Sequence, residues 1–538
     1  MRRSCVVYAK ISRYIILAKS LEPKSRRKEF TYDVSEKTAE STAITRRQAL
    51  SKGAKVAIGA AAVVVAGGAI GYYAMQGPPP AVTTTTTATT MASTTTMAPV
   101  TSAAQPFAGQ TLKWLGPSFM IDDDIVKAYE TQSGVNVVST VTDLDTVRSR
   151  MLTGGANDFD EAAADSAIWQ AWKGKNVTKN FAPSNISRWN TSYLDPIYVT
   201  PETVIGTDIP PPLGPSGPYI AKSVIWPHMW ANTPGVAHPE DDYGLKDQMM
   251  YMAPLCWGYD ACLINPKFLP DVAKNMSIPG TVKSSWEIMY DRKYKGRSGI
   301  LDSVATVTNH VAAYLIVNKM MAVPEVGAND LTPSELDTVI NFLIEQKKAG
   351  QFRVTWSDFM QLVNLYLTEE VWVTDAWRPV IYPVRQGGTP CYYIEPVEGY
   401  RSWHDGNAPT AGTGNDALVF DHMNWQYGPW YAINILKNAY VTATHNGAEI
   451  KTAFGDERYG WVYEGKPTYD PFPDNATKPL FSPMTYDWHM QSGTPDTTNG
   501  AYLDGGSIER RTSLVSVWGR VPHNLDAYFE GWSRFRAA

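Results

Sequence analysis

The sequence predicts an α/β fold in which a mostly parallel sheet is flanked by helices. The first observation is an alternation of short apolar segments with amphipathic helical segments between residues 111 and 166. The second is length, because 538 residues exceed what a single hydrophobic core usually supports, so two or more domains are expected. The third is composition, since 44% hydrophobic and 19% charged residues are typical of a globular protein.

Three strands and two helices alternate at the start of this α/β region. Acidic residues open the first helix and Gly134 ends it, while Asp143 can cap the second. This order predicts parallel strands, and ligands bind at the carboxyl ends of such strands. The loop after Trp114 and the turn at Asp165-Ser166 are therefore expected at one rim of the sheet. The expected strands cover 111–116, 135–142 and 158–166, and the expected helices cover 122–133 and 144–155.

Charge is distributed unevenly along the chain. The first 55 residues contain 14 Lys and Arg against 5 Asp and Glu, whereas the whole chain carries a formal charge of −5. A basic tail and an acidic body indicate a membrane with the tail inside and the body outside. An acidic body also argues against nucleic acid as a partner.

A weakly hydrophobic run follows a pair of arginines, Arg46 and Arg47. The run at 54–76 is long enough to span a bilayer as a helix. The pair and the run resemble a twin-arginine export signal. An ordinary anchor whose arginines follow the positive-inside rule is the alternative. We therefore expect residues 1–53 to form a cytoplasmic tail and 54–76 to form a signal-anchor, which is either retained or cleaved.

Residues 77–107 are dominated by Thr, Pro, Ser and Ala. Such a composition cannot build a packed core, so a disordered stalk is expected. Together with the tail and anchor, the stalk predicts that the folded body lies at the extracellular face of the membrane.

Motifs for metal or hydrolytic chemistry are missing from the sequence. The cysteines Cys5, Cys256, Cys262 and Cys391 have no zinc-ligand spacing. One disulfide with a free thiol, or reduced core cysteines, are both compatible with the sequence. There is neither a G-x-S-x-G nor an H-E-x-x-H motif. We therefore expect neither catalytic residues nor a metal site, and no cofactor.

Five longer segments resemble the extracellular solute-binding proteins of ABC importers, in the branch of the spermidine and putrescine receptors. The most specific is "SSWEIMYDRKYKGRSGILDS". The segment "YMAPLCWGYDACLINP" resembles the family's first crossing between lobes, and "VWVTDAWRPVIYPVRQGGTPCYYIEPVEGYRSWHDGNAPTAGTGN" resembles its return crossing. Two further segments, "FMIDDDIVKAYETQSGVNVVST" and "TGGANDFDEAAADSAIWQAWKGK", resemble the start of the first lobe.

The resemblance implies a two-lobed periplasmic-binding-protein-like fold of type II. Each lobe is a mostly parallel sheet flanked by helices, and two crossover strands join the lobes. Lobe 1 is expected at 108–253, continued at about 378–424, and lobe 2 at 254–377, continued at about 425–538. The resemblance also places Ser402–Asn407 in a loop after the return strand.

The same resemblance implies a set of ligand-binding positions. Aromatic walls are expected from Trp114, Trp257 and Trp377, and a hydrogen bond from Ser166. Asp302 stands where polyamine receptors place an acid against an ammonium group. The full expected set is Trp114, Ser166, Trp257, Tyr259, Asp302, Trp377, Arg378, Trp403 and Asn415.

One departure from the polyamine pattern concerns the ligand class. The family's second acid after the return tryptophan is replaced here, because Arg378 and Pro379 follow Trp377. An arginine in the cleft would favour a carboxylate, phosphate or sulfate. Alternatively, Arg378 pairs with Asp375 or points to solvent.

The predicted function is a monomeric, non-enzymatic receptor that passes a small solute to an ABC permease. A polyamine is one candidate solute, and an organic anion or a metal ion is an alternative within the family. A secreted hydrolase and a structural cell-surface protein are the alternatives from other classes.

Overall fold

The computed structural model describes residues 105–209, 219–232, 249–324, 326–437, 440–468 and 502–538. All of these lie in one compact unit that begins at Met97. The predicted tail, the predicted membrane span at 54–76 and nearly all of the predicted stalk lie outside the described residues. Among the helices that are described, none combines the length and apolar character needed to cross a membrane.

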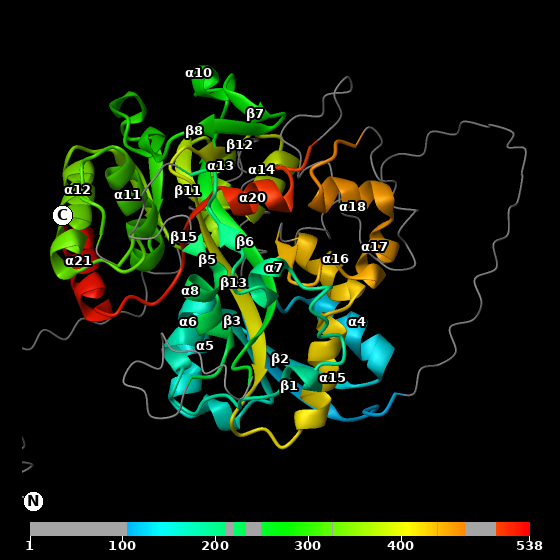
Figure 1. Cartoon of the computed structure of the whole chain (residues 1–538). Coiled ribbons are helices and arrows are strands. Elements are labelled where there is room, and N and C mark those ends of the chain that lie inside the picture. Colours follow the sequence, from blue (N-terminus) through cyan, green and yellow to red (C-terminus); the bar gives the residue numbers. More distant parts are fainter. Residues whose placement is uncertain (1–104, 210–218, 233–248, 325, 438–439, 469–501) are drawn as a thin grey trace, which may run out of the picture. The chain divides into compact units, whose positions relative to one another are not determined.

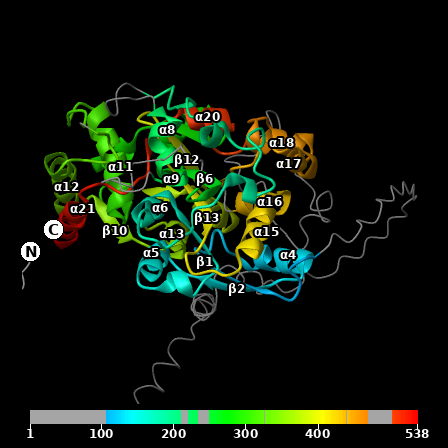
Figure 2. The same ribbon diagram turned by 60° about the horizontal axis from the view of Figure 1, so that its bottom comes forward.

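The first strand group comprises β1, β2 and β3, which pair in parallel with β1 in the middle. The sequence signals for its helices are confirmed, because Asp122 and Asp143 cap α4 and α5, and Gly134 ends α4 with a φ of 70°. Figures 1 and 2 show α4 and α15 on one side of this group and α5 and α6 on the other. The bounds are β1 Thr111–Gly116, α4 Asp123–Ser133, β2 Asn136–Val141, α5 Leu144–Leu152, β3 Glu161–Asp165 and α6 Ser166–Trp172.

The second strand group comprises β9, β10 and β11, which are also parallel, with β9 in the middle. Helix α11 is buried almost all round, because it lies between the sheet and the helices α12 and α21. The bounds are β9 Ser298–Leu301, α11 Val304–Val317, α12 Pro333–Lys348, β10 Phe352–Trp356, α13 Phe359–Leu367, β11 Val373–Trp377, η6 Arg378–Val380, α14 Ile381–Gln386 and α21 Leu525–Ala537.

Two long strands connect the groups and run antiparallel to each other. Strand β6 (Ala253–Ile264) pairs with β11 of the second group, and β13 (Tyr400–Pro409) pairs with β3 of the first. The order in the sheet is therefore β10-β9-β11-β6-β13-β3-β1-β2. The predicted fold class is confirmed, since two parallel, helix-flanked sets of strands are joined by two crossover strands.

The remaining elements extend the two groups or cover the crossing strands. Helix α16 packs against α4, whereas α21 packs against α11 and α12, and the predicted lobe bounds stay a prediction. The elements are α7 Pro196–Val199, β4 Val204–Ile205, β5 Tyr219–Ile220, α8 Ala221–Val224, α9 Trp226–Met229, α10 Pro270–Ala273, β7 Met276–Ile278, β8 Thr281–Ser284, η4 Trp286–Met289, η5 Arg292–Tyr294, β12 Tyr392–Pro396, α15 Asp416–Gln426, α16 Pro429–Lys437, β14 Val441–Thr442, α17 Ala448–Phe454, α18 Asp456–Tyr463, α20 Ile508–Ser513 and β15 Val515–Trp518, with short 3-10 turns η2 Gly155–Asn157 and η3 Pro183–Asn185.

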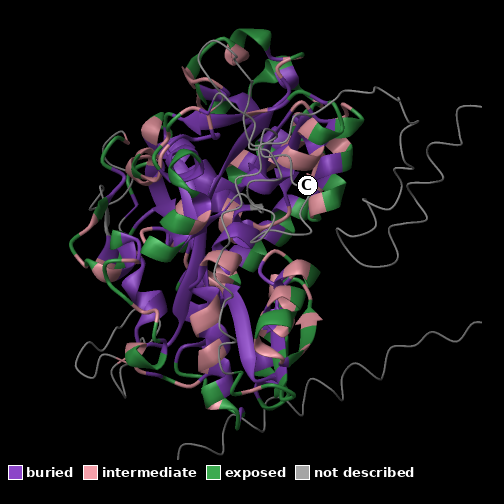
Figure 3. Ribbon diagram, turned by 90° about the vertical axis from the view of Figure 1, so that its right-hand side faces the viewer, coloured by how far each residue is buried: buried purple, intermediate pink, exposed green. Residues whose placement is uncertain are grey.

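The placement of Ser402–Asn407 in a loop is wrong, because this segment lies within β13 and is buried throughout. Its polar side chains are satisfied by neighbours distant in sequence: the Ser402 hydroxyl donates to the Gly258 carbonyl at 2.7 Å, and the Trp518 indole donates to His404 at 3.1 Å. Both crossing strands are buried along their whole length, and Figure 3 shows exposed residues mainly on the outer helices and loops.

Three cysteines fall in the described residues, and all are free and buried: Cys256, Cys262 and Cys391. Burial raises the pKa of each thiol, that of Cys391 to about 12. Of the two cysteine states that the sequence left open, the reduced core thiol is observed for these three.

The close approach of the crossing strands generates a stability prediction. A methyl group at Gly406 would overlap the Ala253 carbonyl oxygen and the Met252 side chain. We expect Gly406→Ala to lower the free energy of unfolding by about 2–3 kcal/mol or to prevent folding, because overpacking here meets backbone. Gly414→Ala is the control, since nothing lies within 4 Å of that position. Chemical denaturation of both variants checks this, and equal stabilities would contradict it.

Candidate functional site

The candidate site lies where β11, β6 and β13 run side by side at the junction between the two strand groups. Asp260 of β6 is in register with Trp377 of β11 on one side and with Arg401 of β13 on the other. Directly opposed residues point to the same face of a sheet, so the three side chains form a row across the junction. This row brings together one residue of the second group and one residue from each crossing strand.

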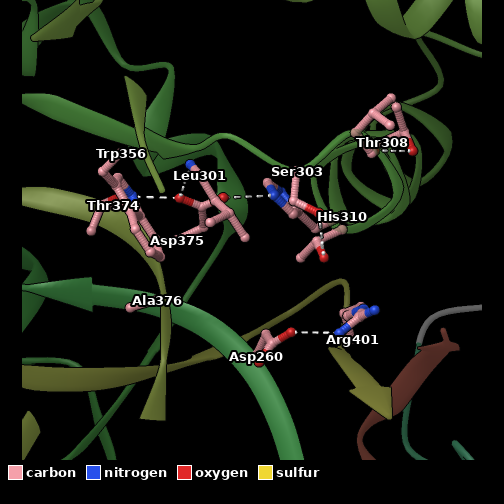
Figure 4. Close-up of polar contacts among 12 residues, drawn as sticks. Asp260, Leu301, Ser303, Thr308, His310, Trp356, Thr374, Asp375, Ala376 and Arg401 are labelled. Carbon is pink, nitrogen blue, oxygen red and sulfur yellow. Dashed lines mark hydrogen bonds and ion pairs between the residues drawn. The ribbon is translucent and has the colours of Figure 1, made fainter. Parts of the chain in front are cut away.

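A buried ion pair occupies the middle of this row. The Arg401 guanidinium donates to Asp260 at 2.8 Å, and the Trp403 indole donates to the other oxygen of Asp260 at 3.1 Å. Burial raises the pKa of the Asp260 carboxyl, and the charge of Arg401 opposes this rise. Figure 4 shows the pair between the ribbons of the two crossing strands. The two connections between the groups are therefore also joined through their side chains.

An aromatic cluster covers the ion pair. The Trp403 ring packs edge-on against Tyr440 at 4.7 Å and lies 6.2 Å from Phe119. Phe119 follows the carboxyl end of β1, so it reaches the junction from the first group. Gly258 gives these rings room, because a Cβ there would lie 2.7 Å from the Trp403 ring and 2.9 Å from Tyr440.

Ser166 adjoins the junction from the first group. Ser166 is the first residue of α6. The Asp165 carboxylate caps this helix by accepting a hydrogen bond from the Ile168 amide at 2.9 Å. The Ser166 hydroxyl donates to the Gly519 carbonyl at 3.4 Å, and a Cβ at Gly519 would lie 2.6 Å from the Arg401 guanidinium. Ser166 is thus separated from Arg401 by a single backbone segment.

Acidic groups surround Arg401 at this point. Asp405 is in register with Asp165 across β13 and β3. Burial raises the pKa of both carboxyls, and for Asp405 the neighbouring Asp165 adds to the rise. Asp405 accepts the Cys256 thiol at 3.8 Å. These contacts favour a neutral Asp405 beside the charged pair.

Tyr259 and Arg378 lie beside the row, at the end of the junction near the C-terminal segment. The Tyr259 hydroxyl donates to the Asp504 carbonyl at 3.0 Å, and its ring lies 4.5 Å from that of Tyr400. Arg378 is buried in η6, directly after β11, with its guanidinium carbon 6.0 Å from the Tyr259 ring centroid. Trp377, half-buried, packs edge-on against Trp356 at 5.0 Å.

Five of the expected ligand-binding residues therefore gather at the junction: Ser166, Tyr259, Trp377, Arg378 and Trp403. The structure places the other four at separate points. Trp114 is buried inside the first group, 4.6 Å from the His422 ring, and His422 pairs with Glu161 at 2.5 Å. Trp257 belongs to β6, but its indole donates to Asp195 at 3.2 Å.

Asp302 and Asn415 have other partners within the chain. The Asp302 carboxylate accepts the Trp532 indole at 2.7 Å and the Arg536 guanidinium at 2.9 Å, so α21 supplies it with a cation. Asn415 is exposed beyond the end of β13 and donates to Asp160 at 3.2 Å. The export-signal residues Arg46 and Arg47 lie outside the described residues.

A polar hub behind the junction connects it with the second group. Asp375 accepts the Leu301 amide at 2.9 Å and the Thr374 hydroxyl at 3.0 Å, and its other oxygen lies 3.2 Å from His310 (Figure 4). The alternative that Arg378 pairs with Asp375 is not among these contacts. Asp375 instead orders β9 and β11, the strands whose ends carry Asp302 and Trp377.

A second candidate site lies away from the junction. One hollow of about 260 Å³ lies on α17 and α18, and none of the expected residues lines it. It is lined by Lys451, Asp456, Tyr459, Glu464 and Lys466. Among the same described residues, no group of three or more His, Cys, Asp or Glu side chains is placed to hold a metal ion.

Sequence reasoning did not single out Asp260, Arg401, Phe119 or Tyr440. Asp260 and Arg401 belong to the two segments that were expected to cross between lobes, but their pairing joins positions far apart in sequence. Phe119 had a weak signal, because it lies in the loop that follows the first strand's carboxyl end.

No family model matches the chain, and no curated protein matches it. Among solved structures, the chain is similar to a putative spermidine/putrescine ABC transporter from Listeria monocytogenes, with 15% identity, a TM-score of 0.46, and 79% of this chain and 99% of that chain covered. A lipoprotein of Treponema pallidum gives 12% identity, a TM-score of 0.49, and coverage of 80% and 100%. A binding protein of A. tumefaciens in complex with agropinic acid gives 13% identity and a TM-score of 0.42, and the match covers 69% of this chain and 91% of that chain. The strand order of this chain itself defines its α/β fold.

The ion pair generates a second prediction. Asp260→Asn leaves the Arg401 charge buried and uncompensated, which costs about 3–5 kcal/mol of unfolding free energy. The exposed pair Arg534–Asp337, at 2.5 Å, is the control, and Asp337→Asn is expected to cost less than about 1 kcal/mol. Urea denaturation measures both, and a loss at Asp260 as small as that at Asp337 would contradict the role of the pair.

The buried imidazole of His404 generates a prediction on pH. Burial lowers its pKa to about 3 in the folded chain, against about 6.5 when unfolded. Its contribution is therefore fully present above pH ~6.5 and is lost as the pH falls towards ~3, by up to about 1.4 kcal/mol per pH unit. In His404→Asn, whose amide oxygen can still accept the Trp518 indole, we expect a shallower loss of stability from pH 6.5 to 5. The buried acids with raised pKa act in the opposite sense, but both chains share them. Parallel slopes for the two chains would contradict the prediction.

Proposed function

We propose that this chain is an extracytoplasmic solute-binding receptor that captures a small solute at the junction and delivers it to an ABC-type permease. The observation that carries the proposal is the junction itself, where β6 and β13 are the two long strands between the parallel groups and residues from both groups meet around Asp260 and Arg401. Two groups connected in this way can bend about the crossing strands.

The proposed mechanism is closure around the solute without chemical change. Phe119 and Ser166 reach the junction from the first group, and Trp377 and Arg378 reach it from the second. A solute that contacts both sets binds the closed form more tightly and shifts the population towards it. The closed form is then the state that a permease can distinguish from the empty one. The export signal, anchor and stalk expected from residues 46–107 support an extracellular position for the receptor.

The charges and rings at the junction bear on two candidate classes of solute. Spermidine and putrescine are the first candidates from sequence, and their ammonium groups suit aromatic walls such as Trp403 and Tyr440. Asp302, the expected ammonium partner, already pairs with Arg536. An organic anion is the second candidate, favoured by the buried Arg378. A secreted hydrolase or a structural surface protein would not show saturable binding of an unchanged solute.

A pair of tryptophans at the two ends of one strand tests this proposal. Trp377 ends β11 at the junction, whereas Trp372 precedes the strand and stacks on Phe268 at 4.2 Å. We expect Trp377→Ala to weaken solute binding by about tenfold or more, since central aromatic contacts dominate binding energy, and Trp372→Ala to leave it unchanged. Equilibrium dialysis of the full chain in mild detergent against polyamines, organic acids, phosphate and sulfate provides the measurement. Solute recovered unchanged and bound by the parent chain is expected, and the absence of saturable binding in every class would contradict the receptor function.

A further inference from the structure

Two buried guanidinium groups share one aromatic neighbour at the junction. Arg378 lies in η6 and Arg511 in α20, and they are 2% and 1% exposed. Their guanidinium carbons lie 6.0 Å and 5.9 Å from the Tyr259 ring centroid. A buried guanidinium charge is unfavourable unless a negative charge compensates it.

The hydrogen bonds of Arg511 go to neutral groups. Its guanidinium donates to the backbone carbonyls of Ser507 at 3.1 Å and Val462 at 3.0 Å, and Arg511 takes part in none of the ion pairs formed between described residues. Burial lowers the pKa of Arg511 to about 10, and the charge of Arg378 contributes to this shift. Arg511 therefore stays protonated at neutral pH and brings into the interior a positive charge that no carboxylate of the described residues pairs with.

The arginines next to this site have carboxylate partners. Arg385 pairs with Asp504 at 2.7 Å, and Arg510, adjacent to Arg511 in sequence, pairs with Glu395 at 2.7 Å. These two carboxylates are thus already neutralised by other cations. Neither carboxylate forms an ion pair with Arg511.

Two tyrosine hydroxyls beside Arg511 are buried and have no hydrogen-bond partner among the residues that the structure describes. These are the hydroxyls of Tyr400 and Tyr463. The Tyr400 ring lies 4.5 Å from the Tyr259 ring, and Tyr463 follows Val462, whose carbonyl accepts Arg511. Burial raises the pKa of both hydroxyls, so each is a proton donor. An unpartnered buried donor is costly, and a bound acceptor would remove that cost.

We propose that Arg511, Tyr400 and Tyr463 form a subsite, close to Arg378, for an anionic group of the solute: a carboxylate, a sulfate or a phosphate. A guanidinium fork binds such groups in a bidentate manner, and tyrosine hydroxyls donate to the remaining oxygens. This inference rests on the proposed receptor function and names its solute class as anionic.

The test measures the affinity of the full chain for inorganic phosphate, sulfate and citrate, with spermidine as the cationic comparison, by equilibrium dialysis with radiolabelled solutes. Dialysis is preferred to a melting shift, because sulfate and phosphate stabilise proteins without binding a site. We expect saturable binding of at least one anion. Tyr400→Phe and Tyr463→Phe should each weaken it about tenfold, and neither should lower the stability of the free chain, because each change removes an unsatisfied hydroxyl.

Two arginine variants complete the test. Arg511→Gln should abolish anion binding, and Arg510→Gln is its matched control, expected to change affinity by less than about threefold because Arg510 already has a carboxylate partner. If Arg511→Gln does not fold, the tyrosine variants decide. Unchanged anion affinity in both tyrosine variants would overturn the subsite. Saturable binding of spermidine alone would overturn the subsite but leave the receptor function standing, whereas no binding of any of the four solutes would count against both.

Discussion

The structure depends on the antiparallel pairing of β6 with β13 and on the buried ion pair that spans it. Neither parallel group contacts the other through its own strands, since the sheet order places both crossing strands between them. The Asp260–Arg401 pair removes two charges from water, which is unfavourable unless both are well satisfied. The Trp403 indole supplies the additional hydrogen bond on Asp260, and the surrounding rings exclude water. Register between the crossing strands is thereby tied to one specific polar contact.

The same constraint explains why functional groups converge at this point. Parallel strands end at one rim, and the loops after β1, β3 and β11 all lead to the crossing strands. Phe119, Ser166 and Arg378 each follow the end of one of these strands. The topology therefore places side chains from both groups at the junction. Arg511 arrives by another route, because α20 precedes β15, which pairs with β13. The junction is consequently built from segments that are widely separated in sequence.

Local signals in the sequence were sufficient for the first strand group. Asp122, Asp143 and Gly134 mark helix ends through contacts within four residues, so β1, α4, β2 and α5 could be predicted from the sequence. Ser402–Asn407 shows the opposite case. The resemblance placed it in a loop, although its polar side chains lie within β13. Partners more than a hundred residues away in sequence, such as Gly258 and Trp518, satisfy these groups inside the sheet.

The resemblance supplied positions for the candidate site, and the ligand-binding role of these residues stays a prediction. Trp377 and Trp403 lie at the junction, but the resemblance did not single out Asp260, because nothing local in β6 shows that its carboxylate faces Arg401. Asp302 was expected to be available to a cationic ligand, and its contact with α21 depends on a helix at the other end of the chain. Long-range charge pairing is therefore the part of this site that sequence patterns do not encode.

We propose that the two strand groups close about the crossing strands when a solute binds. Energy transfer between dyes at the two edges of the sheet measures this closure directly. Dyes attached through Val138→Cys on β2 and Arg353→Cys on β10, both at exposed positions, report on the two groups in a chain that also carries Cys5→Ser. The three buried thiols, whose pKa values burial raises, should stay unlabelled. We expect the transfer efficiency to change with the concentration of added solute and to reach a plateau when the binding site is saturated. An unchanged efficiency at saturating concentrations of a solute that dialysis shows to bind would contradict it.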